Sequence, residues 1–205
     1  MKKNEKEVMD IVFLLDRSGS MSGMESDTIG GYNGYLKNMK KSNAYVTTVL
    51  FDDKYEMITK RTKIPFVKEL DNTIYYTRGG TALLDAIGKT IKYLDEEGSK
   101  KVLFIITTDG LENSSIEYNK SQIKELIEGH SNWEFIYLGA NIDSYEEASS
   151  IGIKKNRTSN FTKSSKGMGL MFDRLKSVSA MYDKECLIEE NWNEGLEDYI
   201  KENKK

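Results

Sequence analysis

The 205-residue sequence contains only one cysteine, Cys186, and only one histidine, His130. A single cysteine cannot form an internal disulfide, which is typical of proteins from a reducing compartment, so we expect a cytoplasmic location. One thiol and one imidazole also provide too few ligands for the common zinc sites and too few bases for most hydrolase mechanisms. This shortage argues against a disulfide-stapled secreted domain and against a zinc enzyme.

Long apolar runs are absent as well, and charged residues interrupt the N-terminal stretch. The sequence therefore predicts no membrane-spanning helix and no secretory signal. The formal net charge of −3 argues against a general nucleic-acid-binding protein. With 38% hydrophobic and 31% charged residues, the chain has the composition of a soluble protein and is long enough to bury the core of one domain.

Four short apolar runs recur along the chain and are rich in valine, isoleucine, leucine and phenylalanine. Their apolar residues are continuous rather than alternating, which indicates strands buried on both faces, as in parallel sheets. The segments between them carry apolar residues three and four positions apart, which is typical of helices that cover a core. This alternation predicts an α/β fold with a mostly parallel sheet. The strands are expected at residues 11–15, 46–51, 102–106 and 133–138.

Two further strands are expected at the margins of this sheet. Residues 51–55 have the composition of a tight hairpin turn, so residues 55–59 are predicted to return as an antiparallel edge strand. A short strand near residues 157–161 would complete the sheet.

The helices and the domain boundary follow from the same periodicity. One domain is predicted over residues 1–185, and the acidic segment 186–205 is predicted to be a C-terminal helix or tail packed on that domain through Trp192. The helices inside the domain are expected at residues 29–39, 84–94, 123–127 and 168–182.

Polar residues interrupt the apolar pattern where the predicted strands end. Asp16, Ser18 and Ser20 follow the first strand, and Asp109 follows the strand at 102–106. Thr81 precedes the helix at 84–94. Ligands of open α/β sheets bind beyond the carboxyl ends of the strands, so these side chains would meet at one edge if the two strands are neighbours.

The chemistry of this set suits a hard cation. Asp16 and Asp109 offer carboxylates, and the three remaining side chains offer neutral hydroxyls, with no thiol or imidazole among them. Magnesium prefers oxygen-only ligation completed by water, and manganese behaves similarly. Gly19 allows the backbone to bend between the two serines, so that the alternate side chains can point at one position.

The segment Asp16-Arg17-Ser18-Gly19-Ser20-Met21, followed by Thr81 and by Thr108-Asp109-Gly110, resembles the metal-ion-dependent adhesion site of von Willebrand factor A domains. The resemblance extends from about residue 8 to about residue 182 in the order and spacing of its motifs. It implies a Rossmann-like, doubly wound, mostly parallel six-stranded sheet with one antiparallel edge strand and helices on both faces. It also suggests a stand-alone domain of the bacterial type.

The resemblance further implies a role for each matching residue. Ser18 and Ser20 would coordinate the ion directly, Thr81 would coordinate it in the ligand-bound state, and Asp16 and Asp109 would act directly or through water. The ion is expected to be Mg²⁺, with Mn²⁺ or Ca²⁺ as alternatives. One coordination position would remain for an acidic side chain of a protein partner, with no nucleic acid or membrane involved.

Several of these residues have ordinary structural alternatives. Thr81 could be the N-cap of the following helix, alone or in addition to a role at the metal. Arg17 is expected to face solvent near the ion, where it could steer an acidic partner. Met21, Met24 and Leu111 could form an apolar rim or could simply pack.

The function predicted from these observations is a non-enzymatic, divalent-metal-dependent protein-interaction module. One alternative is a metal-dependent phosphoryl or ester hydrolase, but a haloacid-dehalogenase-type phosphatase would need an aspartate at the position of Ser18. The sequence also lacks a G-x-S-x-G elbow and a phosphate-binding G-x-x-x-x-G-K-[ST] loop. The other alternative is a scaffold whose metal site is unused.

Overall fold

A single sheet organises the chain, and the computed structural model describes it over residues 7–140 and 143–203. Its six strands lie in the order β3-β2-β1-β4-β5-β6. Only the β2–β3 pair is antiparallel, and the other four pairs are parallel. The strands are β1 (Met9–Asp16), β2 (Tyr45–Phe51), β3 (Tyr55–Lys63), β4 (Lys101–Thr108), β5 (Glu134–Gly139) and β6 (Thr158–Asn160).

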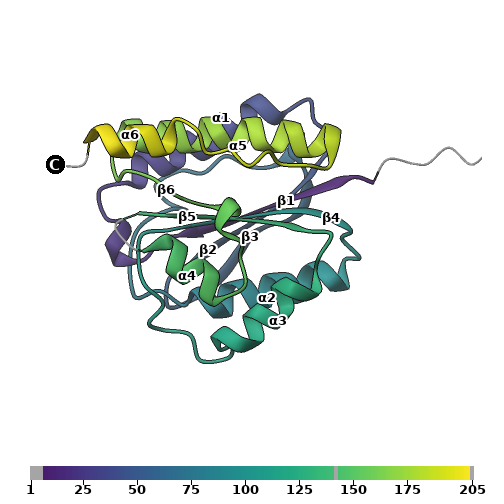
Figure 1. Ribbon diagram of the computed structural model, residues 1–205, viewed down its shortest axis with the longest axis horizontal. Coiled ribbons are helices and arrows are strands. Elements are labelled where there is room, and N and C mark those ends of the chain that lie inside the picture. The colour runs from purple at the N-terminus through teal and green to yellow at the C-terminus, as the bar shows by residue number, and fades with distance from the viewer. Residues whose placement is uncertain (1–6, 141–142, 204–205) are drawn as a thin grey trace, which may run out of the picture.

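Helices cover both faces of this sheet (Figure 1). On one face lie α1 (Glu25–Met39), α5 (Ser165–Glu185) and α6 (Leu196–Asn203), and on the other lie α2 (Leu83–Glu96), α3 (Lys120–Gly129) and α4 (Ser144–Ser150). Short 3₁₀ turns occur at Gly19–Met21, Ile64–Phe66 and Lys155–Arg157. The predicted Rossmann-like, doubly wound fold with one antiparallel edge strand is confirmed.

The two faces of β1 explain why its sequence is continuously apolar. Ile11 and Phe13 pack into the hydrophobic core beneath α1 and α5, whereas Val12 and Leu14 pack into the core beneath α2 and α3. Every residue of β1 is buried. A central parallel strand covered on both sides has no solvent-facing position, so it needs no polar alternation.

Most elements extend a few residues beyond their predicted ranges, and β3 and α4 differ most from the predictions. The edge strand β3 continues to Lys63 rather than ending near residue 59, because the polar residues of its second half lie at the open edge of the sheet. The helix α4 was not predicted at all, since its seven residues, SYEEASS, carry too few apolar side chains to produce a periodic signal.

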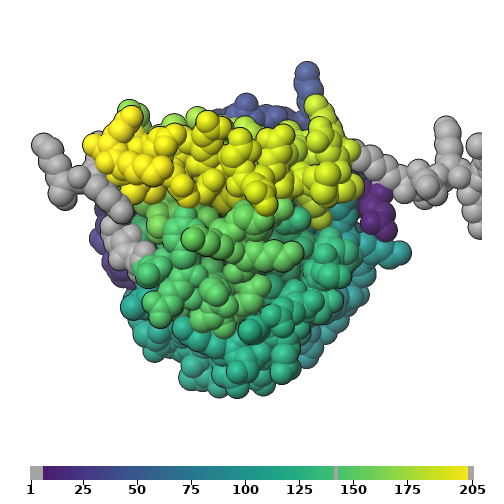
Figure 2. Space-filling view, viewed as in Figure 1, coloured from purple at the N-terminus to yellow at the C-terminus, as the bar shows by residue number. Residues whose placement is uncertain are grey.

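The C-terminal segment lies along the surface of the domain (Figure 2). Ile188, Trp192 and Leu196 are buried in the same core as α1 and α5, and the indole Nε1 of Trp192 donates to the carbonyl of Asn156 at 2.8 Å. The division of the chain into 1–185 and 186–205 stays a prediction. No helix in the described ranges has the length and apolar character needed to span a membrane.

Candidate metal centre

The strand order brings the predicted site residues to one edge of the sheet. β1 lies between β2 and β4, and Asp16 and Thr108 are the last residues of β1 and β4. In the register of these strands, Leu15 pairs with Thr107. The loops that follow β1 and β4 therefore start side by side.

Asp16 lies at the base of the site and is fully buried. Its Oδ1 accepts from the backbone N–H of Ser18 at 2.6 Å, and its Oδ2 accepts from the hydroxyl of Thr108 at 2.6 Å. Burial raises the pKa of Asp16 to about 6, although the hydrogen bonds from Thr108 and Ser18 oppose this shift and the charge of Asp109 adds to it. The carboxylate is thus held in position by donors but has no cationic partner among them.

The hydroxyl groups converge above this carboxylate. Ser18 Oγ lies 2.9 Å from Ser20 Oγ, and Ser20 Oγ donates to Asp109 Oδ1 at 2.5 Å. A Cβ placed on Gly110 would lie 2.7 Å from Thr81 Oγ1, 3.1 Å from Ser20 Oγ and 3.6 Å from Ser18 Oγ. The three hydroxyls therefore surround one position, and glycine at 110 keeps that position open.

We call Asp16, Ser18, Ser20, Thr81 and Asp109 the oxygen cluster. The structure brings all of these predicted residues to the same edge of the sheet. Ser20 is exposed whereas the other side chains are buried, so the cluster opens to the surface on the side of Ser20.

The loop after β4 fixes the position of Thr81. The backbone N–H of Thr81 donates to Asn113 Oδ1 at 2.9 Å, and the N–H of Asn113 donates back to the Thr81 carbonyl at 3.0 Å. Thr81 is not the N-cap of α2, because Ala82 occupies that position and Glu112 Oε2 accepts from the N–H of Leu84 at 2.9 Å. The side chain of Glu112 performs the capping role, which leaves the Thr81 hydroxyl directed to the cluster.

A glycine turn joins the Thr81 loop to the loop after β1. The N–H of Gly19 donates to the carbonyl of Gly79 at 3.1 Å, and the N–H of Arg78 donates to the carbonyl of Arg17 at 2.8 Å. Gly79 has a φ of +65°, and a Cβ there would lie 2.2 Å from Asp53 Oδ1. Only glycine fits this turn, which holds Thr81 beside the serines.

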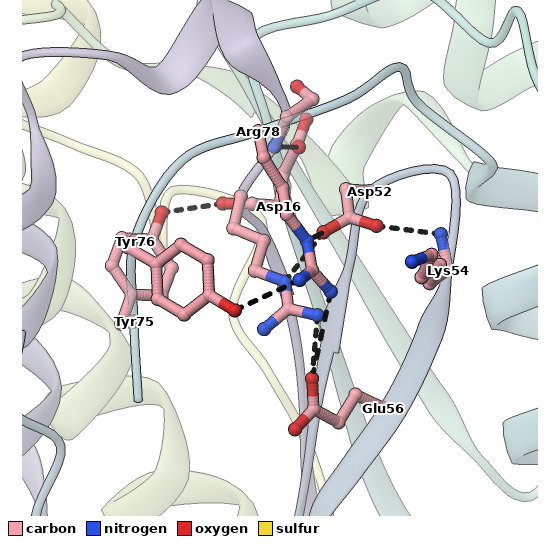
Figure 3. Close-up of polar contacts among 9 residues, drawn as sticks. Asp16, Asp52, Lys54, Glu56, Tyr75, Tyr76 and Arg78 are labelled. Atoms are coloured by element: carbon pink, nitrogen blue, oxygen red, sulfur yellow. Dashed lines mark hydrogen bonds and ion pairs between the residues drawn. The ribbon is translucent and has the colours of Figure 1, made fainter. Parts of the chain in front are cut away.

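The prediction that Arg17 faces solvent is wrong. Its side chain is only 1% exposed, its Nε donates to Asp52 Oδ2 at 2.8 Å, and its Nη2 donates to Glu56 Oε2 at 2.7 Å. Arg78 Nε also donates to Asp52 Oδ2, at 2.7 Å (Figure 3). The guanidinium of Arg17 turns inward because the β2–β3 hairpin offers it buried and half-buried carboxylates. Arg17, Asp52, Glu56 and Arg78 are called the arginine cluster below.

Burial alone would raise the pKa of Asp52, but the hydrogen-bond donors and the positive charge around its carboxylate have the larger, opposite effect. The hydrogen bond from Arg78, the backbone N–H of Lys54 and the charge of Arg17 together lower the pKa of Asp52 below its usual value. The backbone carbonyl of Asp52 also accepts from the N–H of Ala82 at 2.8 Å. The arginine cluster thus anchors the hairpin to two of the three loops that carry the oxygen cluster, the loop after β1 and the loop that contains Thr81.

Two neighbouring tyrosines contact residues of the two clusters (Figure 3). The hydroxyl of Tyr75 donates to the backbone carbonyl of Asp16 at 2.5 Å, which fixes the end of β1. The ring of Tyr76 lies 5.6 Å from the guanidinium carbon of Arg17 and 5.2 Å from that of Arg78, within the range of cation–π contacts. Both tyrosines therefore have structural partners in this region.

Lys163 contacts the oxygen cluster, although no pattern in the sequence predicts this contact. Lys163, in the loop between β6 and α5, places its Nζ 2.9 Å from Asp109 Oδ2 and donates to the backbone carbonyl of Ser20. A single lysine after a short strand carries no periodic or motif signal, and its distance along the chain from residues 16–20 and 109 conceals the contact. Only the tertiary structure shows it.

The expected apolar rim forms only in part. Met21 and Met24 are buried in the core beneath α1, whereas Leu111 is 54% exposed beside the site. The two methionines therefore pack, and only Leu111 is available to a partner.

The donor set fits a hard divalent ion. Among the described residues, no group of three or more histidines, cysteines, aspartates and glutamates gathers as a metal site. The oxygen cluster instead combines two carboxylates with three hydroxyls around the space beside Gly110. Oxygen donors of this kind suit Mg²⁺, Mn²⁺ or Ca²⁺ rather than a thiophilic metal.

The chain belongs to the von Willebrand factor type A domain family, whose family model matches residues 10–173. Members of this family commonly mediate protein interactions. No curated protein matches the sequence at a significant level.

Solved structures with the same fold include matrix and pilus proteins. Proximal thread matrix protein 1 from the mussel byssus, in a form with a zinc-occupied metal-ion-dependent adhesion site motif, has a TM-score of 0.61 and 15% identity over 85% of this chain and 46% of its own. The pilus adhesin SpaC from Lactobacillus rhamnosus GG has a TM-score of 0.66 and 15% identity over 85% of this chain and 30% of its own.

A von Willebrand factor type A protein from Catenulispora acidiphila has a TM-score of 0.59 and 15% identity over 85% of this chain and 43% of its own. The chain spans less than half of the length of each of these three proteins. At such identities the similarity establishes the fold alone.

Proposed function

We propose that the chain is a divalent-metal-dependent protein-interaction module, in which the oxygen cluster holds the ion and an acidic side chain of a partner completes its coordination. The observation that carries this proposal is the convergence of the hydroxyls of Ser18, Ser20 and Thr81 around Gly110, with Asp109 hydrogen-bonded to Ser20. We propose Mg²⁺ as the ion, with Mn²⁺ or Ca²⁺ as alternatives.

The protein's own residues divide the work of holding the ion. Ser18, Ser20 and Thr81 supply neutral oxygens, and Asp109 supplies charge at the open side of the cluster. Asp16 is held at the base by Thr108 and by the backbone of Ser18, so it can act directly or through a water molecule. A bound dication supplies a strong attraction for carboxylates, since neutral hydroxyls leave its charge incompletely balanced.

The same arrangement supports a binding role rather than a catalytic one. The matrix and adhesin proteins that share this fold support the interpretation, as does the exposed Leu111 beside the opening, which offers apolar contact to a partner. The hydrolase alternative lacks a supporting residue, because Ser18 stands where a haloacid-dehalogenase-type phosphatase would need an aspartate. The cytoplasmic location stays part of the proposal.

A thermal-stability titration tests metal binding. A ligand that binds only the folded state stabilises it by RT ln(1 + [L]/Kd), so Mg²⁺ at ten times its Kd should add about 1.4 kcal/mol, or roughly 3–5 °C in Tm. EDTA should reverse the shift. The variant Asp16→Asn should lose the response, whereas Asp198→Asn, at a side chain that is 61% exposed on α6, should keep it.

Partner binding is tested by affinity capture from the native host. Wild-type protein should retain a partner in the presence of Mg²⁺ and release it in EDTA, and Asp16→Asn should retain none. An unchanged Tm with Mg²⁺, Mn²⁺ and Ca²⁺ alike would contradict the metal site and favour a scaffold. Metal-dependent hydrolysis of a phosphate ester that Asp16→Asn abolishes would favour the enzyme.

A further inference from the structure

We propose that Lys163 is a built-in counter-ion of the oxygen cluster, which a divalent cation must displace in order to bind. This inference rests on the proposed metal site and adds a regulation to it. The ammonium group of Lys163 and the metal ion would compete for the carboxylate of Asp109, so the lysine would lower the apparent metal affinity of the domain.

The contacts of Lys163 are those of a cation bound at the mouth of the cluster. Its Nζ lies 2.9 Å from Asp109 Oδ2, and it also donates to the backbone carbonyl of Ser20. The carboxylate of Asp109 is only 2% exposed, and the lysine side chain is 25% exposed. An ion pair with a buried carboxylate is screened less than a surface pair, so this contact differs from the exposed pairs elsewhere on the domain.

Glu25 adds to the negative surroundings of this ammonium. The pKa of Glu25 is lowered, first by the hydroxyl of Thr77 and then by backbone donors, and the nearby charge of Lys163 contributes as well. The ammonium group of Lys163 therefore contacts one acidic side chain and one carbonyl, and it lies near enough to Glu25 for their charges to interact.

The charge balance explains why a lysine belongs there. Asp16 and Asp109 give the cluster two carboxylates, and the guanidinium groups of Arg17 and Arg78 are already engaged by Asp52. Lys163 supplies the cation that contacts Asp109. A dication beside Asp109 would repel this ammonium, since two like charges a few ångströms apart cannot share one carboxylate without a large cost.

Displacement of Lys163 would affect the loop that leads into the start of α5. The next residue, Ser164, is the N-cap of that helix, and its hydroxyl accepts from the N–H of Gly167 at 3.1 Å. Ser165 then donates to Asp27 of α1 at 2.9 Å. Release of Lys163 would therefore free the loop before α5 without breaking the contacts that hold the helix itself.

The first test compares metal affinities by calorimetric titration with MgCl₂. Lys163→Met keeps the aliphatic stem but removes the charge, and it should bind Mg²⁺ roughly ten-fold more tightly than the wild type. Lys176→Met removes the same charge from α5, where the lysine pairs with Asp173, and should leave the affinity unchanged. This control separates displacement from a general change in net charge.

The second test measures the accessibility of Lys163 directly. Acylation by a water-soluble acetyl ester, followed by mass spectrometry, should show a several-fold rise in the labelling of Lys163 when Mg²⁺ is added. Labelling of Lys176 should stay constant and serves as the internal reference. Asp109→Asn should show the high labelling of Lys163 even without metal, because the lysine has lost its carboxylate.

The outcomes separate this inference from the proposed function. Equal Mg²⁺ affinities for wild type and Lys163→Met, with constant labelling of Lys163, would overturn the counter-ion role and leave the metal site standing. Failure of both proteins to bind Mg²⁺, Mn²⁺ or Ca²⁺ would overturn both proposals.

Discussion

The oxygen cluster and the arginine cluster lie side by side at the same edge of the sheet, and each contains a buried aspartate. The surroundings shift the pKa values of these two aspartates in opposite directions. Asp52 is held by two guanidinium groups, and its pKa is lowered. Asp16 receives only a hydroxyl and a backbone N–H, and its pKa is raised to about 6. One cluster is electrostatically complete, whereas the other retains negative charge.

This difference indicates that the arginine cluster has a structural role, whereas the oxygen cluster suits ligand binding. The arginine cluster links the β2–β3 hairpin to the loops that carry Arg17 and Arg78, so it fixes the backbone around the site. In the oxygen cluster, Asp16 is charged at pH 7 although it is buried away from water, and this lowers the stability of the fold when no cation is bound. A protein that merely needed a stable fold would gain by neutralising Asp16, so its retention fits a ligand-binding role.

Breaking the arginine cluster should have the largest effect on stability. Asp52→Ala leaves the buried guanidinium of Arg17 without its main partner, which should lower the free energy of unfolding by about 3 kcal/mol or more. Urea denaturation followed by circular dichroism measures this loss. Glu56→Ala is the matched control, since its side chain is 53% exposed and its loss should cost less than about 1 kcal/mol.

The pH dependence of this loss follows from the lowered pKa. A carboxyl group with a depressed folded-state pKa contributes stability that is present above its unfolded value and disappears as the pH falls through the folded value. The difference between wild type and Asp52→Ala should therefore be full at pH 7 and shrink only in strong acid. A difference that vanished near pH 6 would contradict the assignment.

Removing the charge of Asp16 from the oxygen cluster should raise the free energy of unfolding, whereas Asp52→Ala should lower it. Asp16→Asn keeps an acceptor for Ser18, and its amide can donate to Thr108, so we expect the metal-free protein to gain about 1–3 kcal/mol at pH 7. The raised pKa of about 6 means that the wild-type carboxyl binds a proton as the pH falls. The gain should therefore fade between pH 6 and about pH 4. Loss of stability at pH 7 in EDTA would contradict this comparison.

Filling the space between the three hydroxyls should weaken metal binding much more than it weakens the fold. Gly110→Ala places a Cβ 2.7 Å from Thr81 Oγ1, so Mg²⁺ affinity should fall at least ten-fold while the free energy of unfolding changes by only about 1 kcal/mol. Calorimetric titration and urea denaturation measure the two effects. Gly30→Ala is the matched control, since a Cβ there meets no atom within 4 Å and its φ is not positive, so it should leave the Mg²⁺ affinity unchanged.

The smallest effect is expected at the exposed side of the arginine cluster. Arg78→Gln removes an ion pair whose arginine is 33% exposed, and Arg17 still holds Asp52, so the loss of stability should be about 1 kcal/mol or less. Equal losses for Arg78→Gln and Asp52→Ala would show that Arg17 does not depend on Asp52.

The sequence predicted much of the sheet because its central strands are apolar on both faces, as the packing of β1 shows. The edge location of Asp16 and Asp109 also followed from the strand ends. The inward turn of Arg17 could not be predicted, because its partner Glu56 is 39 residues away and nothing local marks the contact. Lys163 was missed for the same reason, since it meets Ser20 across 143 positions.

Residues 16 and 17 are adjacent in the chain but belong to different clusters, and this has a consequence for how such sequences can change over time. A substitution at Arg17 would remove the buried guanidinium that contacts Asp52, and a substitution at Asp52 would leave Arg17 with Glu56 alone. Among homologous chains we therefore expect positions 17 and 52 to vary together, whereas position 78 can change alone because Arg17 still holds Asp52. A relative could lose its metal ligands one at a time and remain folded, whereas it could lose the buried Arg17–Asp52 pair only by replacing both residues together.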